Sequence, residues 1–272
     1  MLEKELSICL KACQEASKAI MEVYSTSFEV EIKEDNSPVT IADKRSNAII
    51  LGYLKEAFPE DGFLSEESED DLSRMEKSRV WIVDPLDGTK EFVSRNDEFA
   101  INIALAIDKE PVLGLIGVPT QKKIYYAVRG EGAFIFENGE AKRIHVSSRK
   151  EGELIPYCSR SFRNKDAIIF VEDHPEIFAG PCIPLGSSLK MAYIAEGKGD
   201  YFLRLYSGTK EWDVASGDII LREAGGVMIN GEDFKPFRYN RKDVYNHKGY
   251  ILASDEKFSY VELVKKDGLV TD

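Results

Sequence analysis

The feature that most constrains this chain is a series of five strand-like segments between residues 80 and 136. They are VWIVD (80–84), FAINIALAI (99–107), VLGLIGV (112–118), KIYYAV (123–128) and AFIF (133–136). All five are rich in branched and aromatic residues, and the turns between them contain Asp, Gly, Asn or Pro. Because successive strands joined by turns pair in antiparallel fashion, this part of the chain is predicted to form a largely antiparallel sheet.

Two helical patterns precede these strands. Between residues 2 and 23, apolar side chains recur at alternating steps of four and three, which is the stripe of an amphipathic helix. A second helix is predicted to begin near Thr40 and to stop before Pro59, which cannot continue it. Both helices therefore have an apolar face that can cover the sheet.

After about residue 150 the chain alternates between strand and helix patterns. The predicted strands are AIIFV (167–171), YFLRLY (201–206), VMI (227–229) and YILAS (250–254). The predicted helices are SLKMAYIAEG (188–197) and WDVASGDIILREAGG (212–226). This alternation is typical of an α/β unit. We therefore predict an α/β (α+β) fold of two lobes, residues 1–152 and 153–272, with the functional site between them.

Composition disfavours several classes of protein. The 272 residues include 36 basic and 48 acidic ones, and the net charge of −12 argues against nucleic acid polymers and anionic membranes as partners. No apolar run approaches the roughly 20 residues of a membrane helix. The first residues lack the layout of a secretory signal, so a cytoplasmic location is expected.

The usual motifs of other enzyme classes are missing from the sequence. The four cysteines form no Cys-x-x-Cys pair and the three histidines have no zinc-ligand spacing, which disfavours a zinc site. There is also no Gly-x-Ser-x-Gly elbow, no nucleotide triphosphate loop and no Gly-x-Gly-x-x-Gly fingerprint. Serine hydrolases and NAD enzymes are therefore disfavoured.

Acidic residues stand at strand ends, turns and helix starts. Asp84 ends the first strand of the sheet, Asp87 follows at a turn, and Glu66 lies in the acidic stretch before that strand. Asp213 falls in the first turn of a predicted helix. Mg²⁺ prefers oxygen ligands, and carboxylates that share one cleft repel each other unless cations are present. These acids therefore fit a magnesium site, to which Leu86 can offer its backbone carbonyl.

Each acid also has an ordinary structural explanation. Asp87 fits a hairpin turn, Glu66 fits a solvated acidic face, and Asp213 would stabilise a helix dipole. Thr40 and Asp43 have the spacing of a capping box, with Asp in place of the usual Glu or Gln. Taken one at a time, these residues leave both explanations open.

Longer motifs carry a resemblance to a known family. WIVDPLDGT (81–89) is followed by EWDVASG (211–217), and LSEE (64–67) precedes both. Together they resemble the inositol monophosphatase-like metal-dependent phosphatases, and the similarity covers most of the chain. The resemblance implies a layered α-β-α-β-α sandwich, with a mainly antiparallel sheet in the N-terminal lobe and a smaller mixed sheet in the C-terminal lobe.

Three segments look most like the 3′(2′),5′-bisphosphate nucleotidases within that family: DPLDGTKEF (84–92), GSSLK (186–190) and AEGK (195–198). The resemblance implies conversion of adenosine 3′,5′-bisphosphate, a by-product of sulfate assimilation, to AMP and phosphate. Many such nucleotidases have Ser-Arg-Ser-His where this chain has SRSF (159–162). Inositol monophosphate or another sugar phosphate therefore stays open as the substrate.

The resemblance also implies roles for individual residues. The implied ligands of two or three Mg²⁺ ions are Glu66, Asp84, the Leu86 carbonyl, Asp87 and Asp213. Thr89 would orient the attacking water, and Asp43 would accept the proton of that water through the threonine hydroxyl. No covalent phosphoenzyme is required.

Further residues are predicted to bind the substrate. The full set is Glu66, Leu86, Asp87, Gly88, Thr89, Ser187, Ser188, Lys190 and Asp213. The N–H groups of Gly88 and Thr89 precede a plausible helix start, where a phosphate is favoured. Ser187 and Ser188 would donate to a nucleotide and Lys190 would meet a second phosphate, although an N-capped helix with a solvent-facing lysine explains them equally well.

Two arginines and two other functional classes complete the predictions. Arg160 and Arg204 are anion-binding candidates, but a surface salt bridge is the more ordinary role of an arginine. A non-catalytic metal- or ligand-binding module would need only the ligands, whereas this chain also has Thr89 and Asp43. A purely structural acidic protein would leave the motifs unexplained. We therefore expect a phosphoric monoester hydrolase of a small phosphorylated substrate, as a monomer or homodimer.

Overall fold

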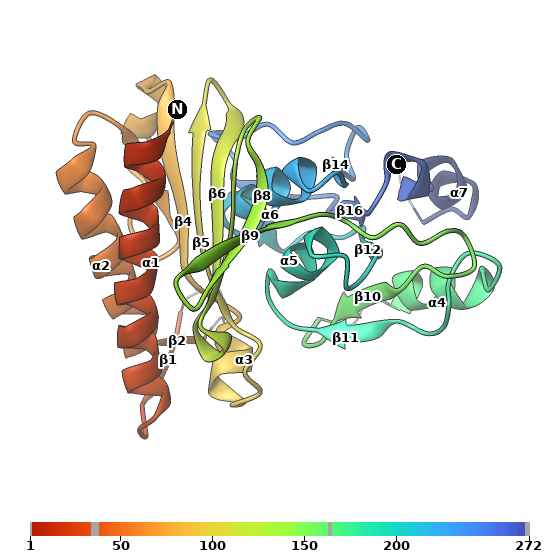
Figure 1. Ribbon diagram of the computed structural model, residues 1–272, viewed down its shortest axis with the longest axis horizontal. Coiled ribbons are helices and arrows are strands. Elements are labelled where there is room, and N and C mark those ends of the chain that lie inside the picture. The colour runs from red at the N-terminus through yellow and green to blue at the C-terminus, as the bar shows by residue number, and fades with distance from the viewer. Residues whose placement is uncertain (1, 34–37, 163–164, 270–272) are drawn as a thin grey trace.

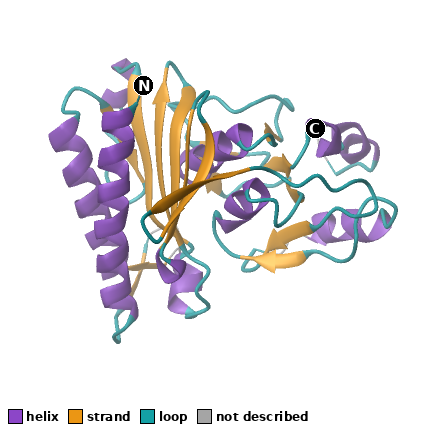
Figure 2. Cartoon of the chain, viewed as in Figure 1, coloured by secondary structure: helices purple, strands orange, loops and turns teal. Residues whose placement is uncertain are grey.

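The molecule has five layers of helices and sheets in a computed structural model that describes residues 2–33, 38–162 and 165–269. In Figure 1, helices α1 and α2 cover one face of a large sheet, and α5 and α6 lie between that sheet and a smaller one. Figure 2 shows the same layers, with α4 and α7 beyond the smaller sheet. The predicted fold class, an α-β-α-β-α sandwich, is confirmed.

The helices and the large sheet have these bounds. The helices are α1 Glu3–Tyr24, α2 Ile41–Ala57, α3 Thr89–Val93, α4 Lys165–Asp173, α5 Leu189–Ala195, α6 Glu211–Glu223 and α7 Val261–Lys266. The large sheet has the order β3-β4-β5-β6-β7-β8-β9 within the described residues. Its strands are β3 Gly62–Ser65, β4 Arg79–Asp87, β5 Ala100–Ile107, β6 Glu110–Val118, β7 Lys123–Val128, β8 Gly132–Glu137 and β9 Glu140–Ile144. Strands β4 to β9 pair in antiparallel fashion, and β3 is parallel to β4.

The smaller sheet is mixed and has the order β11-β10-β12-β16-β14. Its strands are β10 Pro156–Ser159, β11 Ile183–Leu185, β12 Tyr201–Arg204, β14 Val227–Asn230 and β16 Tyr250–Ala253. Strand β10 is parallel to β11 and β12, whereas β16 is antiparallel to β12 and β14. Two short antiparallel pairs complete the described strands: β1 Val30–Ile32 with β2 Pro38–Thr40, and β13 Thr209–Lys210 with β15 Tyr245–Asn246.

One predicted strand is wrong. Residues 167–171 lie in helix α4, where the buried side chains of Ala167, Phe170 and Val171 follow helical spacings of three and four. A short apolar run has the same composition in a buried strand and in a short helix, so it does not distinguish them. The other predicted segments form elements of the expected type, and the additional strands are β1, β2, β3, β9, β10, β11, β13 and β15.

Two glycines in β6 allow helices to pack closely on both faces of the large sheet. A Cβ at Gly114 would lie 2.3 Å from Cγ2 of Ile219 and 2.5 Å from the carbonyl oxygen of Ser216, both in α6. A Cβ at Gly117 would lie 2.3 Å from Sγ of Cys13 in α1. Since side chains of a strand alternate between faces, these two positions face opposite layers. Helix α6, which carries Asp213, is thereby held against the sheet that carries Asp84.

Part of the apolar core lies between the two sheets. One cluster of buried residues includes Ile82 and Ala104 of the large sheet, Ile220 of α6, and Phe202 and Leu252 of the smaller sheet.

The division of the chain into two lobes at residue 152 stays a prediction. In the part of the chain that the structure describes, every helix is too short or too polar to cross a membrane.

Candidate active site

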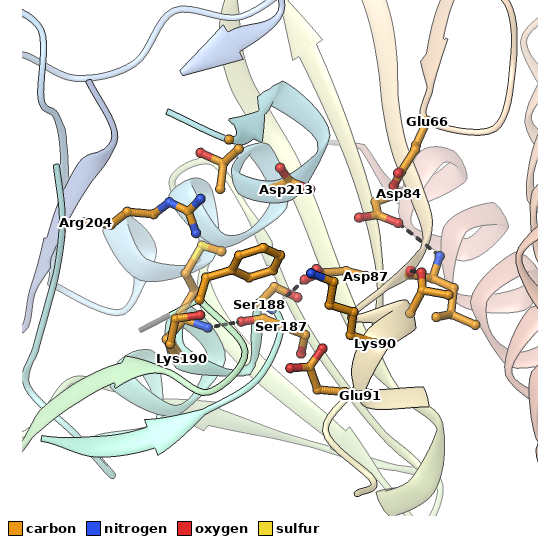
Figure 3. Close-up of a pocket in the computed structure, with 18 of the residues that line it drawn as sticks. Glu66, Asp84, Asp87, Lys90, Glu91, Ser187, Ser188, Lys190, Arg204 and Asp213 are labelled. Carbon is orange, nitrogen blue, oxygen red and sulfur yellow. Dashed lines mark hydrogen bonds between the residues drawn. The ribbon is translucent and has the colours of Figure 1, made fainter. Parts of the chain in front are cut away.

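One cavity, of about 190 Å³, gathers almost all of the predicted site residues. Ten of the eleven line it: Glu66, Asp84, Leu86, Asp87, Gly88, Thr89, Ser187, Ser188, Lys190 and Asp213. Figure 3 shows the carboxylates of Glu66, Asp84, Asp87 and Asp213 and the cationic side chains of Lys90, Lys190 and Arg204 around this cavity. The eleventh residue, Asp43, contacts the cavity through Thr89.

Three carboxylates from separate elements converge in this cavity. Glu66 follows β3, and its N–H donates to the carbonyl of Val83 in β4 (3.2 Å). Asp84 lies in β4, and Asp213 lies in the first turn of α6. One oxygen of each carboxylate lies within 4.8 Å of the other two. This spacing allows one cation to contact all three.

The shape of β4 explains why Asp84 and Asp87 face the cavity. The pairing between β4 and β5 shifts register between these two residues, which is the irregularity of a bulge that redirects side chains. Asp84 is 1% exposed, and its Oδ1 accepts a hydrogen bond from the N–H of Leu86 (3.0 Å). Asp87 accepts hydrogen bonds from the N–H of Ser188 and from Nδ2 of Asn102. Asp87 thereby links the large sheet to the segment before α5.

Burial and mutual repulsion make these carboxylates hard to ionise without a cation. Burial raises the pKa of Asp84 well above its usual range, and the charges of Glu66, Asp87 and Asp213 add to the effect. Burial and the charges of Asp87 and Glu66 raise the pKa of Asp213 to about 8. Burial also raises the pKa of Asp87, although the nearby charge of Lys190 opposes this. A bound divalent cation would remove the repulsion, so the residues fit a metal site.

Lys33 places one positive charge beside this cluster of carboxylates. It follows β1, and its Nζ donates to Oε1 of Glu66 (3.1 Å) and to Glu67. Burial alone would lower the pKa of Lys33, but the charges of Glu66 and Glu67 outweigh burial and raise it. The sequence analysis missed this contact, because nothing in the sequence places the β1–β2 pair beside the acidic stretch.

Thr89 and Asp43 form a hydrogen-bonded pair at the edge of the cavity. Oγ1 of Thr89 donates to Oδ1 of Asp43 (3.1 Å), and Asp43 is 1% exposed. Oδ2 of Asp43 accepts from both the N–H and the hydroxyl of Thr40 (2.7 Å each), so the predicted capping box is present. Burial raises the pKa of Asp43, although the hydrogen bonds from Thr40 and Thr89 oppose this. The capping box therefore holds the Asp43 carboxylate in the position where it accepts from the hydroxyl of Thr89.

Gly88 lets two parts of the chain approach each other above α3. Its φ of 92° lies in the left-handed region, and a Cβ there would lie 3.1 Å from Cβ of Ser187. Helix α3 starts at the next residue, Thr89. Gly88 and Thr89 therefore line the cavity at the point where β4 turns into α3.

The segment before α5 is tied down by hydrogen bonds. The hydroxyl of Ser188 donates to Oδ1 of Asn102 (2.8 Å) and does not cap α5, although Oγ of Ser187 accepts from the N–H of Leu189 (3.4 Å). Lys190 is 5% exposed, so it does not face solvent, and its Nζ donates to the carbonyls of Leu185 (3.1 Å) and Ser187. Burial lowers the pKa of Lys190 to about 8, although the charges of Asp87 and Glu91 oppose this. Ser188 and Lys190 are thus held in place by the protein itself.

Comparisons with known proteins agree with this geometry. The model of the inositol monophosphatase family matches residues 1–266 of the chain. The chain belongs to this family. It is 35% identical over 256 residues to the 3′(2′),5′-bisphosphate nucleotidase CysQ of Salmonella typhimurium, covering 93% of this chain and 99% of the relative. The predicted family and the predicted enzyme class, a phosphoric monoester hydrolase, are confirmed.

Solved structures show the same fold. The crystal structure of CysQ from Bacteroides thetaiotaomicron matches with a TM-score of 0.79 and 33% identity, covering 93% of this chain and 98% of that one. The IMPase of Thermotoga maritima matches with a TM-score of 0.81 and 27% identity, covering 99% of this chain and 98% of that one. Enzymes of this family depend on metal ions, which agrees with the cluster of carboxylates.

Proposed function

We propose that this phosphatase is a Mg²⁺-dependent phosphomonoesterase that converts adenosine 3′,5′-bisphosphate to AMP and phosphate. The observation that carries the proposal is the convergence of Glu66, Asp84 and Asp213 within 4.8 Å, beside the hydrogen-bonded pair of Thr89 and Asp43. The first arrangement suits a divalent cation, and the second suits activation of water. A module that only binds ligands has no need for the second.

The roles of the residues follow from their positions. Glu66, Asp84, Asp87, Asp213 and the Leu86 carbonyl would hold two or three Mg²⁺ ions. When bound, such ions lower the pKa of a water molecule and stabilise negative charge on a leaving oxygen. Carboxylates on three separate elements would fix the ions relative to the substrate, because β4 pairs with β3 and packs against α6.

Thr89 and Asp43 would handle the proton of the attacking water. The hydroxyl of Thr89 already donates to Asp43, so its oxygen lone pairs face away from that carboxylate and can accept a hydrogen bond from water. As the water attacks phosphorus, its proton would pass to the threonine oxygen while the threonine proton passes to Asp43. The raised pKa of Asp43 favours this transfer, because a more basic carboxylate is the better proton acceptor.

Two observations support a bisphosphate nucleotide as the substrate. A relative with 35% identity over 93% of this chain carries the name of a 3′(2′),5′-bisphosphate nucleotidase. The cavity also presents the cations of Lys90, Lys190 and Arg204 in addition to its acids, and an anionic group beyond the reacting phosphate would need them. An inositol monophosphate or another sugar phosphate is the alternative substrate.

Phosphate release by the purified protein tests this proposal. Adenosine 3′,5′-bisphosphate, inositol 1-phosphate and fructose 1,6-bisphosphate should be compared with Mg²⁺ and with a chelator. We expect the bisphosphate nucleotide to give the highest kcat/KM and the chelator to abolish release. Faster cleavage of inositol 1-phosphate would overturn the substrate, and no release from any of the three would overturn the catalytic proposal. Binding of the nucleotide without turnover would point to the non-catalytic module.

A further inference from the structure

Asn102, in β5, is a polar side chain in the apolar core between the two sheets. It is fully buried, and it lies opposite Asp84 of β4 and Ile116 of β6. Since side chains of a strand alternate between faces, Asn102 shares its face with Ala100 and Ala104, which belong to the buried cluster between the sheets. A buried amide is costly unless it is hydrogen-bonded, so this side chain needs partners within the protein.

Asn102 joins Asp87 and Ser188 in a closed ring of hydrogen bonds. Its Nδ2 donates to Oδ2 of Asp87 (3.4 Å), and its Oδ1 accepts from the hydroxyl of Ser188 (2.8 Å). The N–H of Ser188 donates to the same Oδ2 of Asp87, which closes the ring. Because an ionised carboxylate only accepts, the amide has to turn its NH₂ group toward Asp87 and its oxygen toward Ser188.

The ring uses one oxygen of Asp87 and leaves the other for a ligand. Both donors bind Oδ2, whereas Oδ1 accepts no hydrogen bond from any residue that the structure describes. Asp87 and Ser188 line the cavity side by side (Figure 3), but Asn102 is not among the described residues that line it. Asn102 would therefore act through Asp87 and not by touching a substrate.

The same ring also holds the backbone that precedes α5. Ser187 has a φ of 47°, in the left-handed region that residues other than glycine rarely adopt. Its carbonyl accepts from Nζ of Lys190, and the next N–H, that of Ser188, is bound to Asp87. Asn102 could thus serve only to hold this segment, or it could also orient Asp87. The two roles make different predictions for cation binding.

We propose that Asn102 is a positioning residue, which keeps the free oxygen of Asp87 directed at a divalent cation bound in the cavity. This inference rests on the proposed function and deepens it, because Asp87 is one of the proposed Mg²⁺ ligands. Hydrogen bonds to a carboxylate ligand fix its orientation and strengthen metal binding. Without the amide, the carboxylate loses one of the two donors that hold its Oδ2 among the described residues.

Metal binding in the absence of substrate tests this role. By calorimetry with Mn²⁺, Asn102→Leu, which keeps the size of the side chain and removes both polar atoms, should weaken binding at least about tenfold. Ser188→Ala keeps the N–H that binds Asp87 and removes the hydroxyl that orients the amide, so binding about threefold weaker is expected. The double variant should lose no more than Asn102→Leu alone, because the hydroxyl acts on Asp87 only through the amide.

Asn230→Leu is the matched control. Nδ2 of Asn230 also donates to a carboxylate, that of Asp233 (2.6 Å), but this pair lines another cavity, so the Mn²⁺ affinity should equal that of the wild type. Thermal unfolding in chelator shows which variants are folded, and Ser188→Ala decides if Asn102→Leu is not. Wild-type Mn²⁺ affinity in the deciding variant would overturn the positioning role.

Phosphate release separates orientation of Asp87 from a merely structural role. With adenosine 3′,5′-bisphosphate, Asn102→Leu should raise the Mg²⁺ concentration for half-maximal rate at least about tenfold, and should lower kcat at saturating Mg²⁺ by less than about threefold. A lower kcat with an unchanged Mg²⁺ requirement would overturn the inference. If the wild-type protein releases no phosphate, the proposed function fails, and Mn²⁺ binding still decides the role of Asn102.

Discussion

Replacing Asp213 by asparagine should stabilise the metal-free protein and greatly reduce the stabilisation that it gains from Mg²⁺. Burial and the charges of Asp87 and Glu66 raise the pKa of Asp213 from 3.8 to about 8. Asparagine has the same shape and no charge, and its oxygen can still accept from the N–H of Lys210, as Asp213 does (2.6 Å). The substitution therefore removes the cost of either ionising or protonating a buried carboxyl, without removing a helix contact.

The size of the effect follows from the raised pKa. Each pKa unit corresponds to about 1.4 kcal/mol, and about 3 pKa units lie between the usual value of 3.8 and neutral pH, so the raised pKa would correspond to about 4 kcal/mol of unfolding free energy at neutral pH. The side chain of Asp213 is not fully buried, and water screens part of the repulsion, so we expect about 2–3 kcal/mol. For a chain of this length, that corresponds to a rise in Tm of roughly 4–10 °C.

Thermal unfolding at neutral pH, with chelator and with excess Mg²⁺, is the assay. The wild-type protein should gain Tm on addition of Mg²⁺, because an ion that binds only the folded state stabilises it. Asp213→Asn should have the higher Tm in chelator and a much smaller gain with Mg²⁺. Asp173→Asn, at the exposed end of α4, is the matched control and should behave as wild type. A lower Tm of Asp213→Asn in chelator, with an undiminished Mg²⁺ response, would refute the account of the cluster.

Three further predictions follow from the same geometry. Thr89→Val removes the hydroxyl that donates to Asp43 and should lower kcat about 10²–10⁴-fold, whereas Thr89→Ser keeps a hydroxyl and should keep most of the wild-type kcat. Equal rates of phosphate release for the two variants would contradict the proton path. In chelator, Asp84 and Asp213 of the folded protein keep protons that the unfolded chain releases. The free energy of unfolding should therefore fall as the pH rises from about 4 toward about 8. Thermal unfolding measured against pH checks this, and a rise in stability over that range would contradict it. Gly114→Ala forces a methyl group against α6 and should cost about 1–3 kcal/mol in denaturant unfolding, while an unchanged midpoint would argue against the close packing.

Local patterns in the sequence were sufficient to predict much of the fold. The spacing of Thr40 and Asp43 predicts a capped helix start because a capping box involves only neighbouring residues. The strands between residues 99 and 136 were recognisable because each is joined to the next by a short connection. The prediction of a strand at 167–171 was wrong because five apolar residues are too few to distinguish the period of a helix from that of a strand. Strand β11 is short, has an exposed first residue and pairs in parallel with β10, so no local pattern marks it.

The candidate site, like the fold, could be predicted only in part from the sequence. The motifs that contain Asp84 and Asp213 predicted a shared cavity, which the structure contains. Arg204 was an anion-binding candidate in the sequence, but tertiary packing alone decides that its Nε lacks a hydrogen-bond partner among the described residues. The contact between Lys33 and Glu66 likewise depends on where the β1–β2 pair lies. A lysine in a short helix such as α5 is expected to face solvent, and only the tertiary packing shows that Lys190 is buried.

The central claim is that Glu66, Asp84 and Asp213 hold divalent cations, and anomalous diffraction from crystals grown with Mn²⁺ tests it most directly. We predict at least one Mn²⁺ peak at coordination distance, roughly 2.0–2.2 Å, from oxygens of these carboxylates. Lys33 should then have moved away from Glu66. A catalytically active preparation whose Mn²⁺ peaks all lie elsewhere, with Glu66 still paired with Lys33, would contradict the claim.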